Sequence, residues 1–188
     1  LMSIPIGYQF RVRDEIISII NNLRAEGYSN IKLLCHDHRD IPFAASFLDI
    51  DYLYTEDVYA YLSFLKNTRL NITYRLHSFL PCLSFGIPTV KISYDQRAVS
   101  LVDTIGMDAW NINMLQSNVV EEVITRIKSL EKLDRMRAEC KETVWKALKE
   151  TIKYNFDLFA KEVNNNRRRG NDKSFDGTIH NSGSRDKP

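Results

Sequence analysis

Short runs rich in apolar and β-branched residues alternate along this chain with stretches whose apolar residues recur every three or four positions. The apolar runs occupy residues 1–6, 31–35, 51–54, 70–74, 89–93 and 109–112. Such alternation is typical of parallel strands joined by helices, because two parallel neighbours need a long crossover that a helix supplies. The chain is therefore predicted to form an α/β fold, with a parallel sheet flanked by helices.

Residues that begin and end helices support the same division of the chain. Asp14 can cap a helix that stops at Gly27, and Asp57 opens another. A helix that begins at Arg75 ends at Gly86, which suits the left-handed position after a helix. Further helices are predicted over residues 41–48, 96–105, 119–130 and 133–163. The expected fold is thus a Rossmann-like sheet with helices on its faces and a long C-terminal helix.

Composition and charge limit the classes of partner. The 188 residues are 44% apolar, which predicts one globular domain over residues 1–162. Residues 163–188 carry a net charge of +3 and few apolar side chains, so they are predicted to be a disordered basic tail. The remaining body has a net charge of −1, which argues against a nucleic-acid partner.

The chain has no run of about 18 apolar residues and no signal-peptide pattern at its amino end. We therefore expect no transmembrane segment, and a location in the cytoplasm or at the periphery of the inner membrane face. The three cysteines are far apart in the sequence: Cys35, Cys82 and Cys140. They form no CxxC pair and are predicted to be buried thiols in a reducing compartment.

Residues 35–40 contain two histidines and two aspartates directly after a predicted strand. Adjacent and alternate residues on a loop rarely point at one ion, and no further His or Cys lies nearby in the sequence. We expect no metal site here. His38 and Asp40 are instead expected to cap the following helix or to line the rim of a cleft.

The place of a binding site follows from the predicted sheet. An open parallel sheet binds ligands at the carboxyl ends of its strands where the strand order reverses, which in the order 3-2-1-4-5-6 lies between strands one and four. Those strands lead into residues 7–11 and 75–78, and the fifth strand leads into Tyr94, Asp95 and Arg97. The chain has no GxGxxG and no GxxxxGK[ST] motif. The predicted binding site therefore lacks the glycine-rich motifs with which many proteins bind nucleotides.

The side chains at this predicted edge favour an anion. Arg75 and His77 begin one helix and Arg97 begins another, and helix amino ends and guanidinium groups both bind carboxylates and phosphates. A small, multiply charged anion is the expected ligand. The alternatives are that Arg75 pairs with a structural carboxylate such as Asp95 and that His77 is a core or capping histidine. A histidine at a helix amino end stays near neutral until an anion arrives, which suits a general acid or base.

Four segments resemble the carboxyl-terminal half of the polysaccharide pyruvyl transferase family: YRLHS at residues 74–78, FGIPTV at 85–90, ISYDQR at 92–97 and IGM at 105–107. That family shows an Arg-Leu-His sequence after a strand, a Gly-x-Pro turn, and a Tyr-Asp-x-Lys motif before a helix that ends at glycine. Arg97 stands where the family usually has lysine. The resemblance covers roughly residues 3–113.

This resemblance implies one half of a two-domain fold of the GT-B type. It also implies an enzyme that transfers the enolpyruvyl carbons of phosphoenolpyruvate to two sugar hydroxyls, which forms a ketal. The role would be in cell-surface polysaccharide biosynthesis, with phosphoenolpyruvate as donor substrate and no cofactor. By the resemblance, Arg75 and His77 contact the donor, His77 acts as acid, and Arg97 is a second anion clamp. The expected substrate-binding residues are Arg97, Tyr94, Asp95, Ser78 and His38.

The resemblance also implies partners and leaves two alternatives open. The expected partners are a glycan acceptor and either a preceding amino-terminal domain or a second copy bound through the C-terminal helix. The chain is accordingly expected to be the donor-binding half of a longer protein or a truncated relative. The alternatives are one half of a sugar-nucleotide glycosyltransferase, and a non-enzymatic interaction module of Rossmann-like fold.

Overall fold

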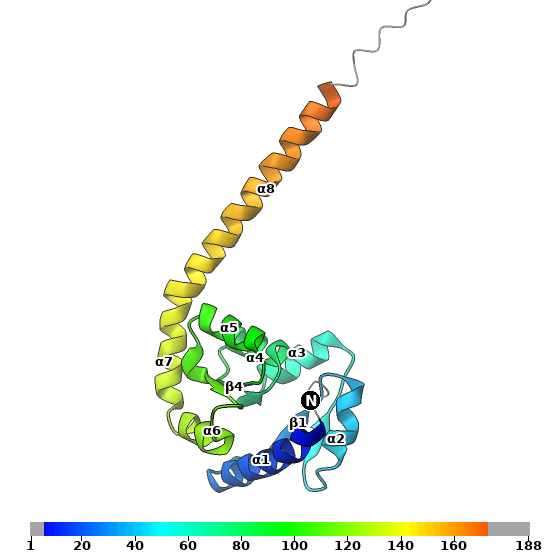
Figure 1. Ribbon diagram of the computed structural model, residues 1–188, viewed down its shortest axis with the longest axis vertical. Coiled ribbons are helices and arrows are strands. Elements are labelled where there is room, and N and C mark those ends of the chain that lie inside the picture. The colour runs from blue at the N-terminus through cyan, green and yellow to red at the C-terminus, as the bar shows by residue number, and fades with distance from the viewer. Residues whose placement is uncertain (1–5, 173–188) are drawn as a thin grey trace, which may run out of the picture. The chain divides into compact units, whose positions relative to one another are not determined.

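The computed structural model describes residues 6–172, and the side chains of residues 12–165. The contacts divide the chain into two units, Leu1–Glu142 and Thr143–Pro188, which are described separately (Figure 1). Within the described part, no helix combines the length and apolar character that crossing a membrane requires.

The first unit holds parallel strands in two sheets. β1 (Lys32–Leu34) pairs with β2 (Asp51–Leu53) so that Leu33 lies opposite Tyr52. β4 (Thr89–Ser93) is the middle strand of the other sheet, between β3 (Asn71–Thr73) and β5 (Asn111–Asn113). Helices follow the strands, so the predicted α/β, Rossmann-like fold is confirmed.

Seven helices of the first unit are described: α1 (Ile6–Ala25), α2 (Ile41–Ala45), α3 (Val58–Lys66), α4 (Leu76–Phe85), α5 (Gln96–Thr104), α6 (Val119–Ile127) and α7 (Leu130–Cys140). The Asp57 side chain accepts hydrogen bonds from the N–H groups of Tyr59 and Ala60 at 2.8 and 3.3 Å, which confirms it as the cap of α3. Gly86 ends α4 with a φ of 78°, as its position in the sequence predicts.

The core of the first unit forms around β4, all five residues of which are buried. Val90 and Ile92 pack in one apolar cluster with residues of α1 and α6: Val12, Ile19, Leu23, Val119, Val123 and Ile127. Burial on both faces is expected for a central parallel strand. The buried residues of β4 include three polar ones, Thr89, Lys91 and Ser93, and Lys91 is the one that carries a charged group.

The amino-terminal part of the fold differs from the prediction. Of the strand predicted over residues 1–6, residues 1–5 lie outside the described part, and Ile6 already belongs to α1. Residues 7–11, expected at the end of that strand, are therefore helical, and the helix predicted from Asp14 begins eight residues earlier. Residues 6–13 continue the helix without a break, so Asp14 lies inside it and does not cap it. No described strand lies between β1 and β3, so the sheet is split at the position predicted for the first strand.

The second unit consists of α8 (Lys146–Asp172), which follows a π-helical turn over Lys141–Trp145. α8 confirms the long C-terminal helix but continues nine residues past Val163, where the tail was predicted to begin. Once a helix is nucleated, each further residue adds a backbone hydrogen bond, and arginine is a good helix former, so a polar sequence is no barrier. Residues 173–188 of the predicted tail lie outside the described residues.

Candidate active site at the carboxyl edge of the strands

An ion pair joins the segments that follow β1 and β3. Arg75 lies just after β3, and its Nη2 donates to Oδ1 of Asp40 at 3.2 Å. Oδ2 of Asp40 accepts the backbone N–H groups of His36 and Asp37 at 3.2 and 3.3 Å. Asp40 is buried, whereas 27% of the Arg75 side chain is exposed. Arg75 therefore does pair with a carboxylate, as one of the two alternatives has it, but that carboxylate is Asp40 and not Asp95.

A second contact brings α3 to the same edge. The Tyr61 hydroxyl lies 3.2 Å from each ring nitrogen of His36 and donates to the His77 carbonyl at 3.4 Å. Burial, together with the positive charge of Arg75, lowers the pKa of His36 to about 4, so its ring is neutral at physiological pH. His36 and Tyr61 are not among the predicted site residues. His36 directly follows a strand end, as Arg75 does, and this position is the feature that could have indicated it.

His77 lies in the first turn of α4, and it is exposed. Arg75 occupies the cap position in an extended conformation, with φ −109° and ψ 133°, and no described side chain caps this helix end. The first N–H groups of a helix have no partner within the helix itself. The start of α4 therefore offers backbone donors beside a guanidinium and an imidazole, an arrangement suited to an anion.

The end of β4 carries the other predicted site residues. The Asp95 side chain caps α5 by accepting the N–H of Ala98 at 2.8 Å. Arg97 lies 3.8 Å from Asp95, and 92% of its side chain is exposed, so this ion pair holds it weakly. Tyr94 is half-buried against the core cluster. Of these three residues, Arg97 is the one whose side chain can turn toward a ligand without leaving a buried contact.

Lys91 lies beneath this edge and links the ends of two strands. Its Nζ donates to the carbonyl oxygens of Tyr74 and Ile92 at 3.0 and 2.6 Å. Burial lowers the pKa of Lys91 to about 8; the nearby Asp95 carboxylate opposes this shift, and the Arg75 charge adds to it. Lys91 is not among the predicted site residues, although a lysine between Val90 and Ile92 in a predicted buried strand is an unusual feature.

Two predicted site residues have other partners. Ser78 is buried and exchanges hydrogen bonds with the Asn71 side chain at 2.9 and 3.1 Å, which fastens α4 to β3. His38 is exposed in a 3₁₀ turn, with its ring 3.4 Å from Asp37. Asp37 caps that turn by accepting the N–H of Arg39 at 2.9 Å, and the Asp40 side chain completes the capping box by accepting the N–H of Asp37 at 3.3 Å. The prediction that Asp40 lines the rim agrees with its bond to Arg75.

The three cysteines are free thiols. Cys35 and Cys82 are buried, as predicted, whereas Cys140 is only half-buried and so differs from the prediction. Burial raises the pKa of Cys82 to about 11. Among the described residues, no group of three or more His, Cys, Asp or Glu is arranged to hold a metal ion.

The fold and this edge define an α/β protein of Rossmann-like topology whose basic and imidazole groups gather where β1 and β3 end. The family model for polysaccharide pyruvyl transferase matches residues 1–96, and the chain belongs to that family. A search of curated proteins and a search of solved structures each gave no match. The matched region includes Arg75 and His77 and ends one residue before Arg97.

Proposed function

We propose that this chain binds phosphoenolpyruvate at the carboxyl edge of its strands and transfers the pyruvyl group to two hydroxyls of a glycan. Family membership supports the proposal, and one structural observation carries it. Arg75 and His77 stand at the start of α4, which no described side chain caps. Phosphoenolpyruvate has a carboxylate and a phosphate, and both groups bind well to guanidinium and free N–H donors.

In this proposal Arg75 holds the donor while remaining fixed to Asp40. A guanidinium has five N–H donors, and Asp40 takes one of them at 3.2 Å, so others are left for the donor. Lys91 adds positive charge from below, and Arg97 closes on the anion from the end of β4. Tyr94 and Asp95 position that segment, and Ser78 and His38 act on the donor only indirectly.

His77 is proposed as the general acid. It gives a proton to the methylene carbon of phosphoenolpyruvate, which becomes a methyl group, and the neighbouring carbon becomes electrophilic. One sugar hydroxyl adds to that carbon and returns its proton to His77. The bond to the phosphate oxygen then breaks, and the second hydroxyl adds while its proton leaves with inorganic phosphate. The products are a cyclic ketal and phosphate, and no cofactor is required.

The proposed setting follows from this chemistry. The acceptor is a glycan destined for the cell surface, and the reaction takes place in the cytoplasm or at the inner membrane face, where the donor is available. The chain would act as the donor-binding half of a GT-B-type enzyme. Its remaining partner is a preceding domain or a second copy bound through α8.

The assignment of His77 is tested with His77→Gln in the whole chain, together with any natural segment that precedes it. Phosphate release from phosphoenolpyruvate is measured in the presence of sugars that carry two neighbouring hydroxyls. We expect a loss of about 10²- to 10⁴-fold in rate, with donor binding retained, since a positioned acid contributes that much. His180→Gln is the matched control because it removes a histidine that the proposal does not use. Near-normal turnover by His77→Gln would contradict the proposal.

A further inference from the structure

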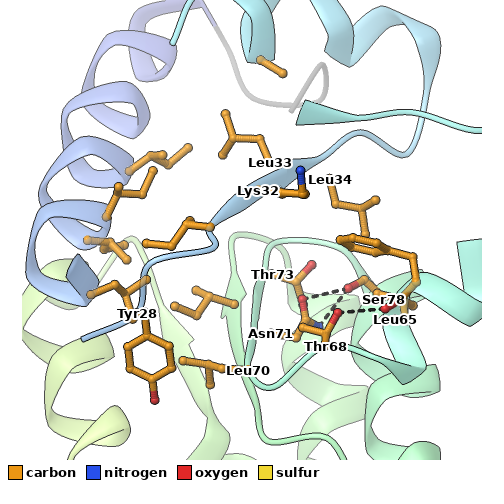
Figure 2. Close-up of a pocket in the computed structure, with 18 of the residues that line it drawn as sticks. Tyr28, Lys32, Leu33, Leu34, Leu65, Thr68, Leu70, Asn71, Thr73 and Ser78 are labelled. Atoms are coloured by element: carbon orange, nitrogen blue, oxygen red, sulfur yellow. Dashed lines mark hydrogen bonds between the residues drawn. The ribbon is translucent and has the colours of Figure 1, made fainter. Parts of the chain in front are cut away.

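His36 lines the same hollow as the arginine of the proposed anion site. A cavity of about 560 Å³ lies between β1 and β3 (Figure 2). Its lining includes residues from the segments that follow these two strands: His36 and Asp40 after β1, and Arg75 and Ser78 after β3. The end of β1 therefore brings an imidazole to the space beside Arg75, and the proposed function gives this imidazole no role.

The Asp40 carboxylate fixes His36 relative to Arg75. Oδ2 of Asp40 accepts the backbone N–H of His36 at 3.2 Å, and Oδ1 accepts Nη2 of Arg75 at 3.2 Å. Asp40 is buried, and hydrogen bonds to an ionised group are stronger than those between neutral groups. The charge of Arg75 is close enough to help lower the pKa of His36. One carboxylate thus holds the imidazole segment and the guanidinium as neighbours.

The ring of His36 can make more hydrogen bonds than its described neighbours use. A neutral imidazole has one nitrogen that donates a hydrogen bond and one that accepts, and the pKa of about 4 keeps this ring neutral. The Tyr61 hydroxyl lies 3.2 Å from each ring nitrogen but has a single proton. When Tyr61 donates this proton to one ring nitrogen, the other nitrogen carries the N–H, for which no further partner is described.

We propose that His36 donates this ring N–H to an oxygen of the phosphoenolpyruvate that Arg75 binds, and that Tyr61 is the positioning residue that holds the ring. This inference rests on the proposed function. An anion selects the arrangement in which Tyr61 donates to the ring, because only then is the ring N–H available to it. The Tyr61 proton then leaves the His77 carbonyl, whose contact of 3.4 Å is longer than the contacts to the ring.

A neutral ring suits this place better than another cation does. Arg75 and the buried Lys91 already supply positive charge at this edge, and like charges close together repel each other. A neutral N–H adds a hydrogen bond to the anion without adding to that repulsion. The imidazole of His36 thereby complements the guanidinium of Arg75.

A pure packing role for His36 predicts a different order of variants. The rings of His36 and Tyr61 meet edge to face, with centroids 5.3 Å apart and planes at 63°. His36→Phe keeps an aromatic ring for this contact but has no N–H, whereas His36→Gln keeps an N–H donor and loses the ring. Each variant retains what the other removes, so the pair separates hydrogen bonding from packing.

The experiment is a titration of the whole chain and its variants with phosphoenolpyruvate, followed by nuclear magnetic resonance of the backbone amides at the start of α4. We expect His36→Phe to weaken binding about 10-fold and His36→Gln to stay within about threefold of the unmodified chain. Tyr61→Phe should weaken binding about threefold. Tyr59→Phe is the matched control on the same helix and should bind normally, since this side chain is 85% exposed.

Equal binding by His36→Phe and the unmodified chain would overturn the inference, and so would a larger loss in His36→Gln than in His36→Phe. In either case, a loss of binding in Arg75→Ala would leave the proposed anion site standing. Absence of binding to the unmodified chain would overturn both. Should a His36 variant fail to fold, the nitrogen signals of the His36 ring in the unmodified chain decide the question. They should change on saturation with phosphoenolpyruvate, and unchanged signals would overturn the inference.

Discussion

Lys91 stands out at the scale of single residues, because a fully buried ammonium is costly and no carboxylate of the described side chains forms an ion pair with it. Its two bonds to carbonyl oxygens offset part of that cost and hold the peptide after Tyr74, from which Arg75 projects. In the proposed function, this charge supports the anion site from below. The pKa of about 8 means that the amine loses its proton in the folded protein well before it does so in the unfolded chain.

Lys91→Met tests this description through the pH dependence of stability. Between about pH 8 and 10.5 the unfolded chain keeps the Lys91 proton while the folded protein has lost it, so stability rises with pH through that window. Relative to Lys91→Met, the unmodified protein should gain about 3 kcal/mol across it. Urea unfolding of both proteins from pH 7 to 10.5 measures the difference. Parallel curves would show that Lys91 keeps its ordinary pKa.

The sequence allows only part of the site to be predicted at this scale. Arg75 and His77 follow a strand directly, and their position alone predicts that they lie at its carboxyl edge. The partners of this pair come from distant segments: Asp40 lies 35 residues before Arg75, and Tyr61 lies 16 residues before His77. Such contacts depend on how the elements pack, which local patterns do not encode.

Among the helices and strands, α3 shows how a local sequence feature supports the site. Asp57 caps this helix, and Tyr61 one turn later reaches both His36 and the backbone of His77. A cap stabilises a helix by pairing the N–H groups that have no partner within it. A less stable α3 would therefore weaken the contacts that Tyr61 makes with His36 and His77.

Asp57→Ala should lower the free energy of unfolding by about 1 kcal/mol, because two N–H groups of α3 lose their acceptor. Asp57→Ser keeps a capping oxygen and should lose much less. Chemical denaturation of the two variants measures the difference. If the two variants are equally stable, the cap contributes nothing to α3.

Helices and strands with clear end residues are well predicted, whereas the two ends of the chain are not. Asp57 and Gly86 mark helix boundaries through side-chain and backbone geometry, and the structure agrees at both. Asp14 lies inside α1 because the preceding residues continue the helix without a break. Polar composition also misplaced the end of α8, since composition governs burial more directly than it governs helix propagation.

At the scale of the whole molecule, the parallel α/β class was predictable because the strand–helix alternation recurs along the chain. The two sheets have the neighbours that the order 3-2-1-4-5-6 requires on either side of its first strand. The first strand of this order is predicted over residues 1–6, of which residues 1–5 lie outside the described part.

α8 carries a second prediction about the whole molecule. Ile152, Phe156 and Phe159 recur at spacings of four and three and are 56, 69 and 65% exposed. Such a stripe suits a paired helix of a second copy. Phe156→Ser with Phe159→Ser should abolish a concentration-dependent dimer in sedimentation equilibrium. Tyr154→Ser should not, because this residue is equally exposed on the opposite side of the helix. A monomer at all concentrations in the unmodified protein would contradict pairing through α8.

The most direct test of the anion site is a titration of the labelled chain with phosphoenolpyruvate, followed by nuclear magnetic resonance. We predict chemical-shift changes for the backbone amides at the start of α4 and for the His36 ring. The dissociation constant should be about 1 mM, which corresponds to a binding free energy of about 4 kcal/mol. Affinity should fall as salt rises and should be lost in Arg75→Ala. It should be unchanged in Arg69→Ala, whose guanidinium instead stacks on Tyr28. Shifts confined to the arginines after residue 166, with none near His77, would contradict the proposed site.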